Sequence, residues 1–202
     1  SANNPGVEMN LHEFMRPVTL TASVLILSFM FTGLATWYSR WRGLIDHPGE
    51  RHSHTVATPR GGGIGIILAL VVASVAFFSF LEGFWTSTIL PGVVVLAILG
   101  WWVDHSSLSA RFRFLVQLAV SVALLWCLAD GDWNRQVIFL IPAGLFLLWM
   151  TNLYNFMDGS NGMVGAQGVF AGSILFCLYS SAGDAAPAMA SAMVAAACLG
   201  FL

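Results

Sequence analysis

Residues 137–157 form the apolar run VIFLIPAGLFLLWMTNLYNFM, which is followed at once by Asp158 and Gly159. The hydrocarbon core of a bilayer is about 30 Å thick and takes roughly 20 apolar residues of helix to cross. The run is therefore long enough to span a membrane. It ends in amide and carboxyl side chains, and polar groups at the mouth of a span are costly to place there, so they indicate a functional site.

The composition of the whole chain agrees with this run. Of 202 residues, 57% are hydrophobic and 9% are charged, whereas a soluble domain carries about 25% charged residues. The apolar stretches are continuous, which favours helices over transmembrane strands. We predict an all-α polytopic membrane helix bundle with six to seven transmembrane helices. The three cysteines lie inside apolar runs and are expected to be small core residues.

The hydropathy pattern divides the chain into spans. We expect them at residues 17–38, 62–81, 84–103, 108–128, 137–157 and 163–180. A seventh apolar run begins near Ala188 and is too short at Leu202 to cross straight through, so we expect the chain to be truncated relative to a longer parent. Residues 1–16 are expected to be an extracytoplasmic segment, and residues 17–202 a single transmembrane domain.

The arginines give an orientation. Those that follow the first and third expected spans are Arg40, Arg42, Arg51, Arg60, Arg111 and Arg113. The opposite side holds only Arg16 and Arg135. Positive charge collects in short cytoplasmic loops, so the side with six arginines is predicted to be cytoplasmic and the N-terminus to lie outside.

The first polar group of interest is Asn152, Asn155 and Asp158. Residues three apart share a helix face, so the three side chains are expected to line up at the cytoplasmic mouth of their span. Amide and carboxylate oxygens are hard donors that suit Mg²⁺ held partly by phosphates. The alternative is structural: the asparagines tie helices together and Asp158 marks a helix end.

The second group begins at Asp104, directly after the expected span 84–103. Ser106, Ser107 or Ser109 is expected to cap the next helix. Capping explains the serines well and Asp104 only partly, so Asp104 is a further candidate for chemistry.

The third group is DHPGERHSHTVATPRGGG, residues 46–63, in the one long connection. Arginine and histidine in a loop suit anionic ligands, and arginine grips phosphate with two hydrogen bonds. The glycines open a helix whose N-terminal amides favour an anion. We rank phosphate handling first, a basic patch against anionic lipid headgroups second, and zinc binding by the histidines last.

These three stretches, in this order, resemble the polyprenyl-phosphate N-acetylhexosamine-1-phosphate transferases of glycosyltransferase family 4, which include phospho-N-acetylmuramoyl-pentapeptide and O-antigen-initiating transferases. The resemblance covers about residues 44–202. Residues 46–63 are similar to the family's first cytoplasmic loop, and residues 152–159 to its Asn-x-x-Asn-x-x-Asp-Gly signature. Residues 108–117 resemble the segment after its aspartate pair.

The resemblance implies a reaction at the cytoplasmic face of a bacterial inner membrane, in cell-wall or lipopolysaccharide synthesis. A polyprenyl phosphate attacks the β-phosphate of a UDP-N-acetyl sugar and UMP is released, with Mg²⁺ as cofactor. The implied partners are these two substrates, the membrane and a second copy in a homodimer, with no nucleic acid.

The resemblance also assigns roles to individual residues. It implies catalytic roles for Asp104 and Asp158, and metal binding by Asn155 together with Asp158. The residues implied to bind substrate are Arg51, His54, Arg60 and Asn152. Val103 stands where the family carries the first of two aspartates, and Asn161 where many members carry another. A later glycine-flanked aspartate and a histidine-rich loop of the family do not occur before Leu202.

Two other functions remain open. A transporter or channel would carry charges near the bilayer midplane and interrupted helices, whereas the charges here lie at span ends. A catalytically inactive scaffold of a glycan-assembly complex is favoured by Val103, because valine neither accepts a proton nor binds a metal.

Overall fold

The computed structural model describes residues 11–46, 58–59, 61–76, 85–106, 108–129, 133–157 and 162–202. The α-helices in this part of the chain are α1 (Leu11–Arg42), α2 (Ile64–Ala76), α3 (Leu90–His105), α4 (Ala110–Leu128), α5 (Trp133–Met157), α6 (Met163–Ala182) and α7 (Ala185–Phe201). A π-helical turn, Trp85–Ile89, precedes α3, and the short strands β1 (Ile45–Asp46) and β2 (Thr58–Pro59) pair antiparallel. The predicted all-α bundle is confirmed.

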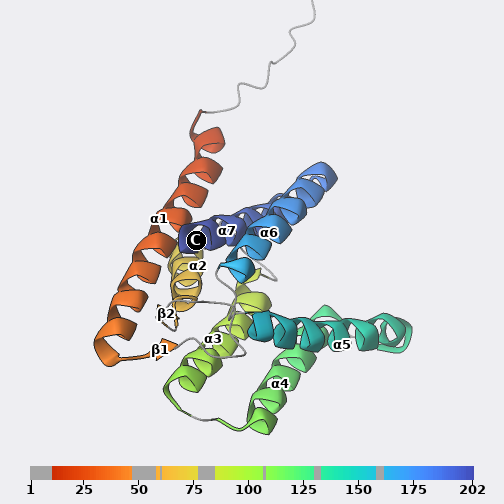
Figure 1. The fold of residues 1–202 in the computed structure, drawn as a ribbon. Coiled ribbons are helices and arrows are strands. Elements are labelled where there is room, and N and C mark those ends of the chain that lie inside the picture. Colours follow the sequence, from red (N-terminus) through yellow and green to blue (C-terminus); the bar gives the residue numbers. More distant parts are fainter. Residues whose placement is uncertain are drawn as a thin grey trace, which may run out of the picture.

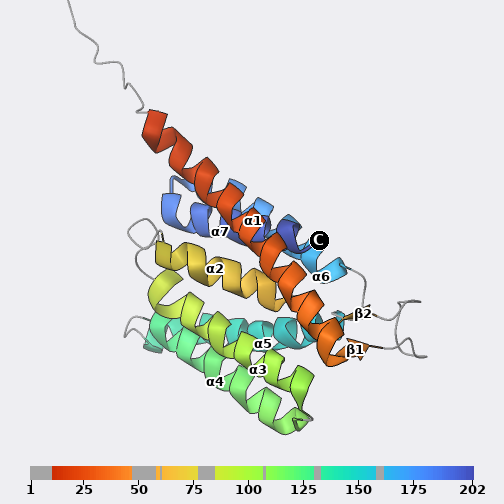
Figure 2. The same cartoon turned by 90° about the vertical axis from the view of Figure 1, so that its left-hand side faces the viewer.

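The helices pack in chain order, and the last returns to the first. Each of α1 to α6 contacts the helix that follows it, and α7 contacts both α1 and α2 (Figure 1). Figure 2 shows β1 and β2 at the end of the bundle where α1 ends. We call this the strand end of the bundle: it holds β1, β2, the end of α1 and the start of α2.

Five helical segments are long and apolar enough to cross a membrane. They are Pro17–Arg42, Ser87–His105, Ala110–Leu128, Val137–Tyr154 and Met163–Ala182. These match five of the expected spans closely, because a continuous apolar run of this length has few alternatives to a spanning helix. The helix expected over residues 62–81 is described only as α2, which ends at Ala76.

Helix α7 is the most deeply buried element, although its sequence predicted an incomplete span. Its 17 residues include eight that are buried, and Met193 packs with Leu20 and Val24 of α1 in the main hydrophobic core. The reason is its small side chains, which let other helices approach closely. A Cβ on Gly200 would collide with the carbonyl oxygen of Leu25 in α1.

Side-chain hydrogen bonding and glycines tighten the same region. The buried Ser28 hydroxyl of α1 donates to the carbonyl oxygen of Ala197 in α7 at 2.6 Å. On α6, a Cβ on Gly168 would approach Cys198 of α7 to 2.5 Å, and one on Gly172 would approach Ala195 to 2.9 Å. These glycines therefore let α6 and α7 pack closely.

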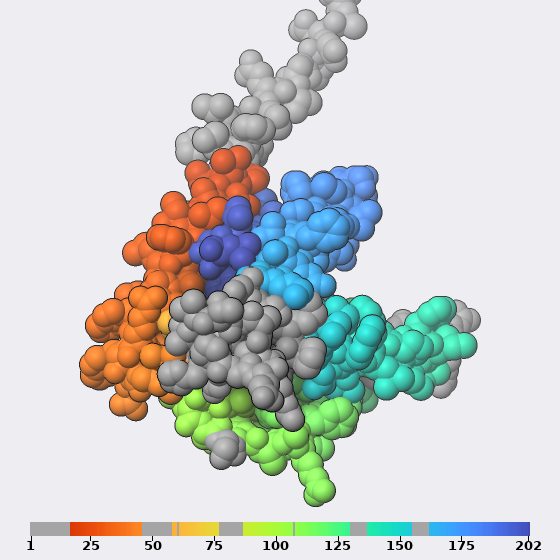
Figure 3. Space-filling model, in the orientation of Figure 1, coloured from red at the N-terminus to blue at the C-terminus, as the bar shows by residue number. Residues whose placement is uncertain are grey.

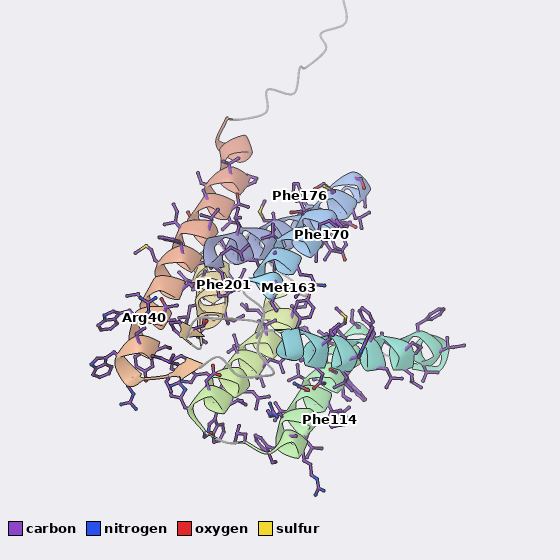
Figure 4. The ribbon with its side chains drawn as sticks, viewed as in Figure 1. Arg40, Phe114, Met163, Phe170, Phe176 and Phe201 are labelled. Atoms are coloured by element: carbon purple, nitrogen blue, oxygen red, sulfur yellow. The ribbon has the colours of Figure 1, made fainter. Side chains whose placement is uncertain are left out.

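The outer surface of the bundle is apolar. Phe139 of α5 is 75% exposed and Phe170 of α6 is 67% exposed, and Figure 4 shows where Phe170 and Phe176 lie along α6. Apolar side chains at this exposure face hydrocarbon in a membrane-spanning helix. The chain is a multi-pass membrane protein.

Candidate active site

The end of α1 is the first part of the site. The span expected from the sequence ends at residue 38, but α1 continues to Arg42. The helix stops at Gly43, whose φ is 69°. There the N–H of Gly43 donates to the carbonyl of Arg40 at 3.3 Å, and the N–H of Leu44 donates to the carbonyl of Ser39 at 2.8 Å. This paired arrangement satisfies the last carbonyls of a helix and favours glycine at the turn.

The two strands bring the chain back to the same place. β1 follows the turn directly, and its Ile45 lies opposite Pro59 of β2. Asp46 and Thr58, which are 12 positions apart in the sequence, therefore lie side by side at the strand end of the bundle. Gly61 follows with φ of 80°, a backbone conformation that residues with a Cβ rarely adopt.

Asp104 meets this returning segment. It lies on the last turn of α3 and is half-buried. A Cβ placed on Gly61 would lie 3.6 Å from Asp104 Oδ2, 3.7 Å from Trp101 Cζ3 and 3.8 Å from Ser39 Oγ. Three elements far apart in the sequence thus meet around one glycine. We call Ser39, Gly61, Trp101 and Asp104 the Gly61 cluster.

Stacked rings hold Trp101 in position. Its ring stacks on Tyr38 of α1 with centroids 5.6 Å apart, and lies 4.4 Å from the ring of His105. The His105 ring is fixed in turn, because its Nδ1–H donates to the carbonyl oxygen of Trp101 at 2.8 Å. The rings flanking Asp104 therefore form a wall between α1 and α3.

Phe201 connects the Gly61 cluster to the start of α6. A Cβ on Gly62 would lie 3.2 Å from Phe201 Cε2, and one on Gly165 of α6 would lie 2.9 Å from Phe201 Cδ1. Figure 4 shows Phe201 and Met163, the first residue of α6, near each other. Helix α6 begins four residues after Gly159. Phe201 therefore contacts both the segment that closes the third polar group and the first turn of the helix that follows the first polar group in the sequence.

Asn152 takes part in helix packing. Its Nδ2 donates to Gln117 Oε1 of α4 at 3.1 Å and to the carbonyl oxygen of Leu148 at 2.8 Å. These hydrogen bonds support the structural alternative for Asn152, in which its amide NH₂ ties α5 to α4. Substrate binding by Asn152 stays a prediction.

The other predicted site residues are placed less fully. Asn155 lies in the last turn of α5, and the structure describes its backbone only. Arg51, His54, Arg60 and Asp158 lie outside the described residues, so their predicted roles stay predictions. Ser109 caps α4 as predicted, because its Oγ accepts a hydrogen bond from the N–H of Phe112 at 3.2 Å.

Sequence reasoning missed two members of the Gly61 cluster. Ser39, which is 1% exposed, sits in an aromatic and basic stretch typical of a membrane interface, and no spacing links it to Asp104. Trp101 had a usable signal, since it precedes Asp104 by three residues on one helix and shares its face. Figure 3 shows the end of α1 and helices α3 and α4 on the same face of the molecule.

The arrangement is that of a polytopic membrane protein with polar groups gathered at one end of its helices. The model of glycosyl transferase family 4 matches residues 85–202 of the chain. The chain therefore belongs to this family of polyprenyl-phosphate hexosamine-1-phosphate transferases. The resemblance inferred from the three motifs is confirmed.

Several curated proteins are similar to the chain. It is 30% identical over 214 residues to the decaprenyl-phosphate N-acetylglucosaminephosphotransferase of Mycolicibacterium smegmatis, covering 92% of the chain and 52% of that protein. It is 29% identical over 170 residues to the probable undecaprenyl-phosphate N-acetylglucosaminyl 1-phosphate transferase of Bacillus subtilis, covering 79% of the chain and 47% of that protein. The chain spans about half the length of these curated relatives. No solved structure matches it significantly.

Proposed function

We propose that the chain forms a site that transfers a sugar-1-phosphate from a UDP-N-acetyl sugar to a polyprenyl phosphate, with release of UMP, at the cytoplasmic face of a bacterial inner membrane. The main support for this proposal is the proximity of Asp104, from the second polar group, to Gly61, from the third, at the strand end of the bundle. Asp104 contacts the segment that closes the first loop, and Phe201 joins that segment to the helix after the asparagine signature. The relatives' names supply the class of acceptor lipid.

The reaction needs positioning more than a protein nucleophile. An oxygen of the lipid phosphate forms a bond to the β-phosphorus, and the bond from that phosphorus to the bridging oxygen breaks. UMP leaves with the electron pair. Asp104 orients the lipid phosphate or takes its remaining proton.

The amide and carboxylate oxygens of the asparagine signature are of the kind that suits Mg²⁺. Among the described residues, no three histidine, cysteine or acidic side chains lie close enough to hold a metal by themselves. Mg²⁺ usually takes one or two carboxylates and completes its shell with substrate phosphates and water, which suits an amide and a carboxylate. Asn155 and Asp158 would hold the ion, which would offset the negative charge of the diphosphate. Arg51, His54 and Arg60 would contact phosphate.

The test is release of UMP by the chain in proteoliposomes given polyprenyl phosphate, MgCl₂ and UDP-N-acetylglucosamine or another UDP-N-acetyl sugar. Asp104→Asn should lower the rate about 100-fold or more, because it removes a charge at the reacting phosphate. Asp184→Asn, at the exposed turn between α6 and α7, is the matched control and should leave the rate unchanged. Absence of UMP with every sugar tried would contradict the proposal.

Two further measurements examine the metal and the missing aspartate. EDTA should abolish UMP release and added MgCl₂ should restore it. Val103 is half-buried beside Asp104 on α3, so Val103→Asp should raise the rate if an aspartate pair assists the reaction. An unchanged rate would show that a single carboxylate is enough.

A further inference from the structure

Two stacked aromatic rings connect α1 and α3 beside the Gly61 cluster. The ring of Tyr38 on α1 lies on the ring of Trp101 on α3, with centroids 5.6 Å apart and planes 28° apart. Tyr38 directly precedes Ser39, and Trp101 precedes Asp104 by three residues on the same helix. We propose that this stack is a positioning element that sets the spacing of Ser39 and Asp104 around Gly61, an inference that rests on the proposed function.

The packing of the helices shows why a direct connection between α1 and α3 matters. Helix α1 packs mainly against α2 and α7, whereas α3 packs mainly against α2 and α4. The two helices therefore share α2 as a neighbour, and α2 only begins at the strand end of the bundle, at Ile64. The stack of Tyr38 on Trp101 adds a direct constraint between α1 and α3 at this end, where the cluster lies.

The Trp101 side chain has packing partners from three parts of the chain. It stacks on Tyr38 of α1, and its Cζ3 would lie 3.7 Å from a Cβ on Gly61, which leads into α2. On α3 itself, the centroid of the His105 ring lies 4.4 Å from that of the Trp101 ring. Neighbours on these sides restrict the rotamers that Trp101 can adopt. The ring is therefore held in one place relative to all three segments.

An aromatic belt at the membrane interface is the alternative explanation for rings at this level. It accounts for Trp37, Trp41 and Trp102, which are 66%, 70% and 53% exposed. Tyr38 and Trp101 are half-buried instead, and each faces the ring of the other. Burial against a ring on another helix indicates a packing role rather than contact with lipid headgroups.

The stack matters for the proposed reaction because Asp104 acts on a phosphate at a defined place. A group that accepts a proton must lie within about 2.6–3.2 Å of the donor atom, and a displacement of about 1 Å can lower a rate about 100-fold. Loss of the stack frees Asp104 to move relative to Ser39 and Gly61. The charge of the carboxylate remains, so turnover should change more than binding of the nucleotide sugar.

Variants of Trp101 in proteoliposomes measure the effect on turnover. Trp101→Leu should lower kcat for UMP release about tenfold and change KM for the UDP-N-acetyl sugar by less than about twofold. Trp101→Phe keeps a ring in the stack and should retain most of the activity. Trp102→Leu is the matched control, because the Trp102 ring contacts Phe112 of α4 instead, with centroids 6.3 Å apart. Its kcat should equal that of the unmodified chain.

Variants of Tyr38 test the stack from the other helix, and they decide the question if Trp101→Leu does not fold. Tyr38→Leu should lower kcat as Trp101→Leu does, whereas Tyr38→Phe keeps the ring, loses the hydroxyl and should not. The double variant should be little slower than either single variant, because both changes remove the same contact. Equal loss in Tyr38→Phe and Tyr38→Leu, or in Trp101→Leu and Trp102→Leu, would overturn the proposal.

A distance between two spin labels measures the spacing without turnover. The labels are attached to Arg40→Cys, exposed near the end of α1 (Figure 4), and to Ser106→Cys, exposed after α3. The three native cysteines are replaced by alanine. Pulsed EPR in nanodiscs should give a narrow distance distribution that Trp101→Leu and Tyr38→Leu broaden and Trp102→Leu leaves unchanged. An unchanged distribution in both leucine variants of the stack would overturn the proposal.

The two readouts separate this inference from the proposed function. A broadened distribution in Trp101→Leu with an unchanged kcat would overturn the inference and leave the proposed reaction standing. Absence of UMP from the unmodified chain with every sugar tried, together with a broadened distribution in Trp101→Leu, would overturn the proposed reaction and support the spacing role of the stack alone.

Discussion

At the scale of single residues, Gly61 combines two constraints. Its φ of 80° strains any residue with a Cβ, and that Cβ would sit at ordinary contact distance from Asp104, Trp101 and Ser39. Gly61→Ala should therefore cost about 1–2 kcal/mol of stability from the backbone. It should also lower UMP release several-fold, because a methyl group enters the space beside the carboxylate.

A variant at Gly43 distinguishes the loss of backbone stability from the loss of space beside the Asp104 carboxylate. Its φ is 69° and a Cβ there would meet nothing within 4 Å. Gly43→Ala should lose similar stability in thermal unfolding and keep its UMP release per folded molecule. If both variants lose activity to the same degree, the Gly61 cluster has no special part in the reaction.

At the scale of elements, close contact between α1 and α7 is the feature to examine. A Cβ on Gly200 would meet the Leu25 carbonyl and come within 3.0 Å of Ser28, so the helices must move apart in Gly200→Ala. We expect a loss of about 2 kcal/mol or more, measured by unfolding in mixed micelles. Gly33→Ala on α1 is the control, since nothing lies within 4 Å of its Cβ position, and it should be neutral or stabilising. Equal effects would remove close packing as the explanation.

The bounds and burial of the helices were partly predictable from the sequence, for physical reasons that differ between helices. The spans were predictable because long apolar runs have one stable form in a bilayer. The extension of α1 to Arg42 was not, because a helix that leaves hydrocarbon can continue until a residue such as Gly43 ends it. Burial of α7 was also not predictable, since small apolar residues suit both lipid and a helix interface.

Helix packing, which the sequence does not specify, also limited what could be predicted of the candidate site. Asp104 could be named as a candidate because it directly follows an apolar span, and its catalytic role stays a prediction. The approach of Ser39 and Gly61 to Asp104 was not predictable, because it depends on how α1, α2 and α3 pack. Asn152 carried two interpretations in the sequence, and only the position of Gln117 on α4 showed its structural contact.

At the scale of the whole molecule, the strand end must face the compartment that supplies a water-soluble nucleotide sugar. The arginine bias predicts that this compartment is the cytoplasm. In a chain with Cys127, Cys177 and Cys198 replaced, Ser106→Cys lies just after α3 and should react with a membrane-impermeant maleimide only after permeabilisation.

Asp184→Cys, in the turn between α6 and α7, should instead react in intact spheroplasts. The two positions lie at opposite ends of the bundle, so opposite accessibility follows from helices that cross the membrane in alternation. Labelling of Ser106→Cys from outside would place the Gly61 cluster away from the nucleotide sugar. That result would contradict the proposed reaction whatever the chemistry of Asp104, because substrate and site would then be separated by the bilayer.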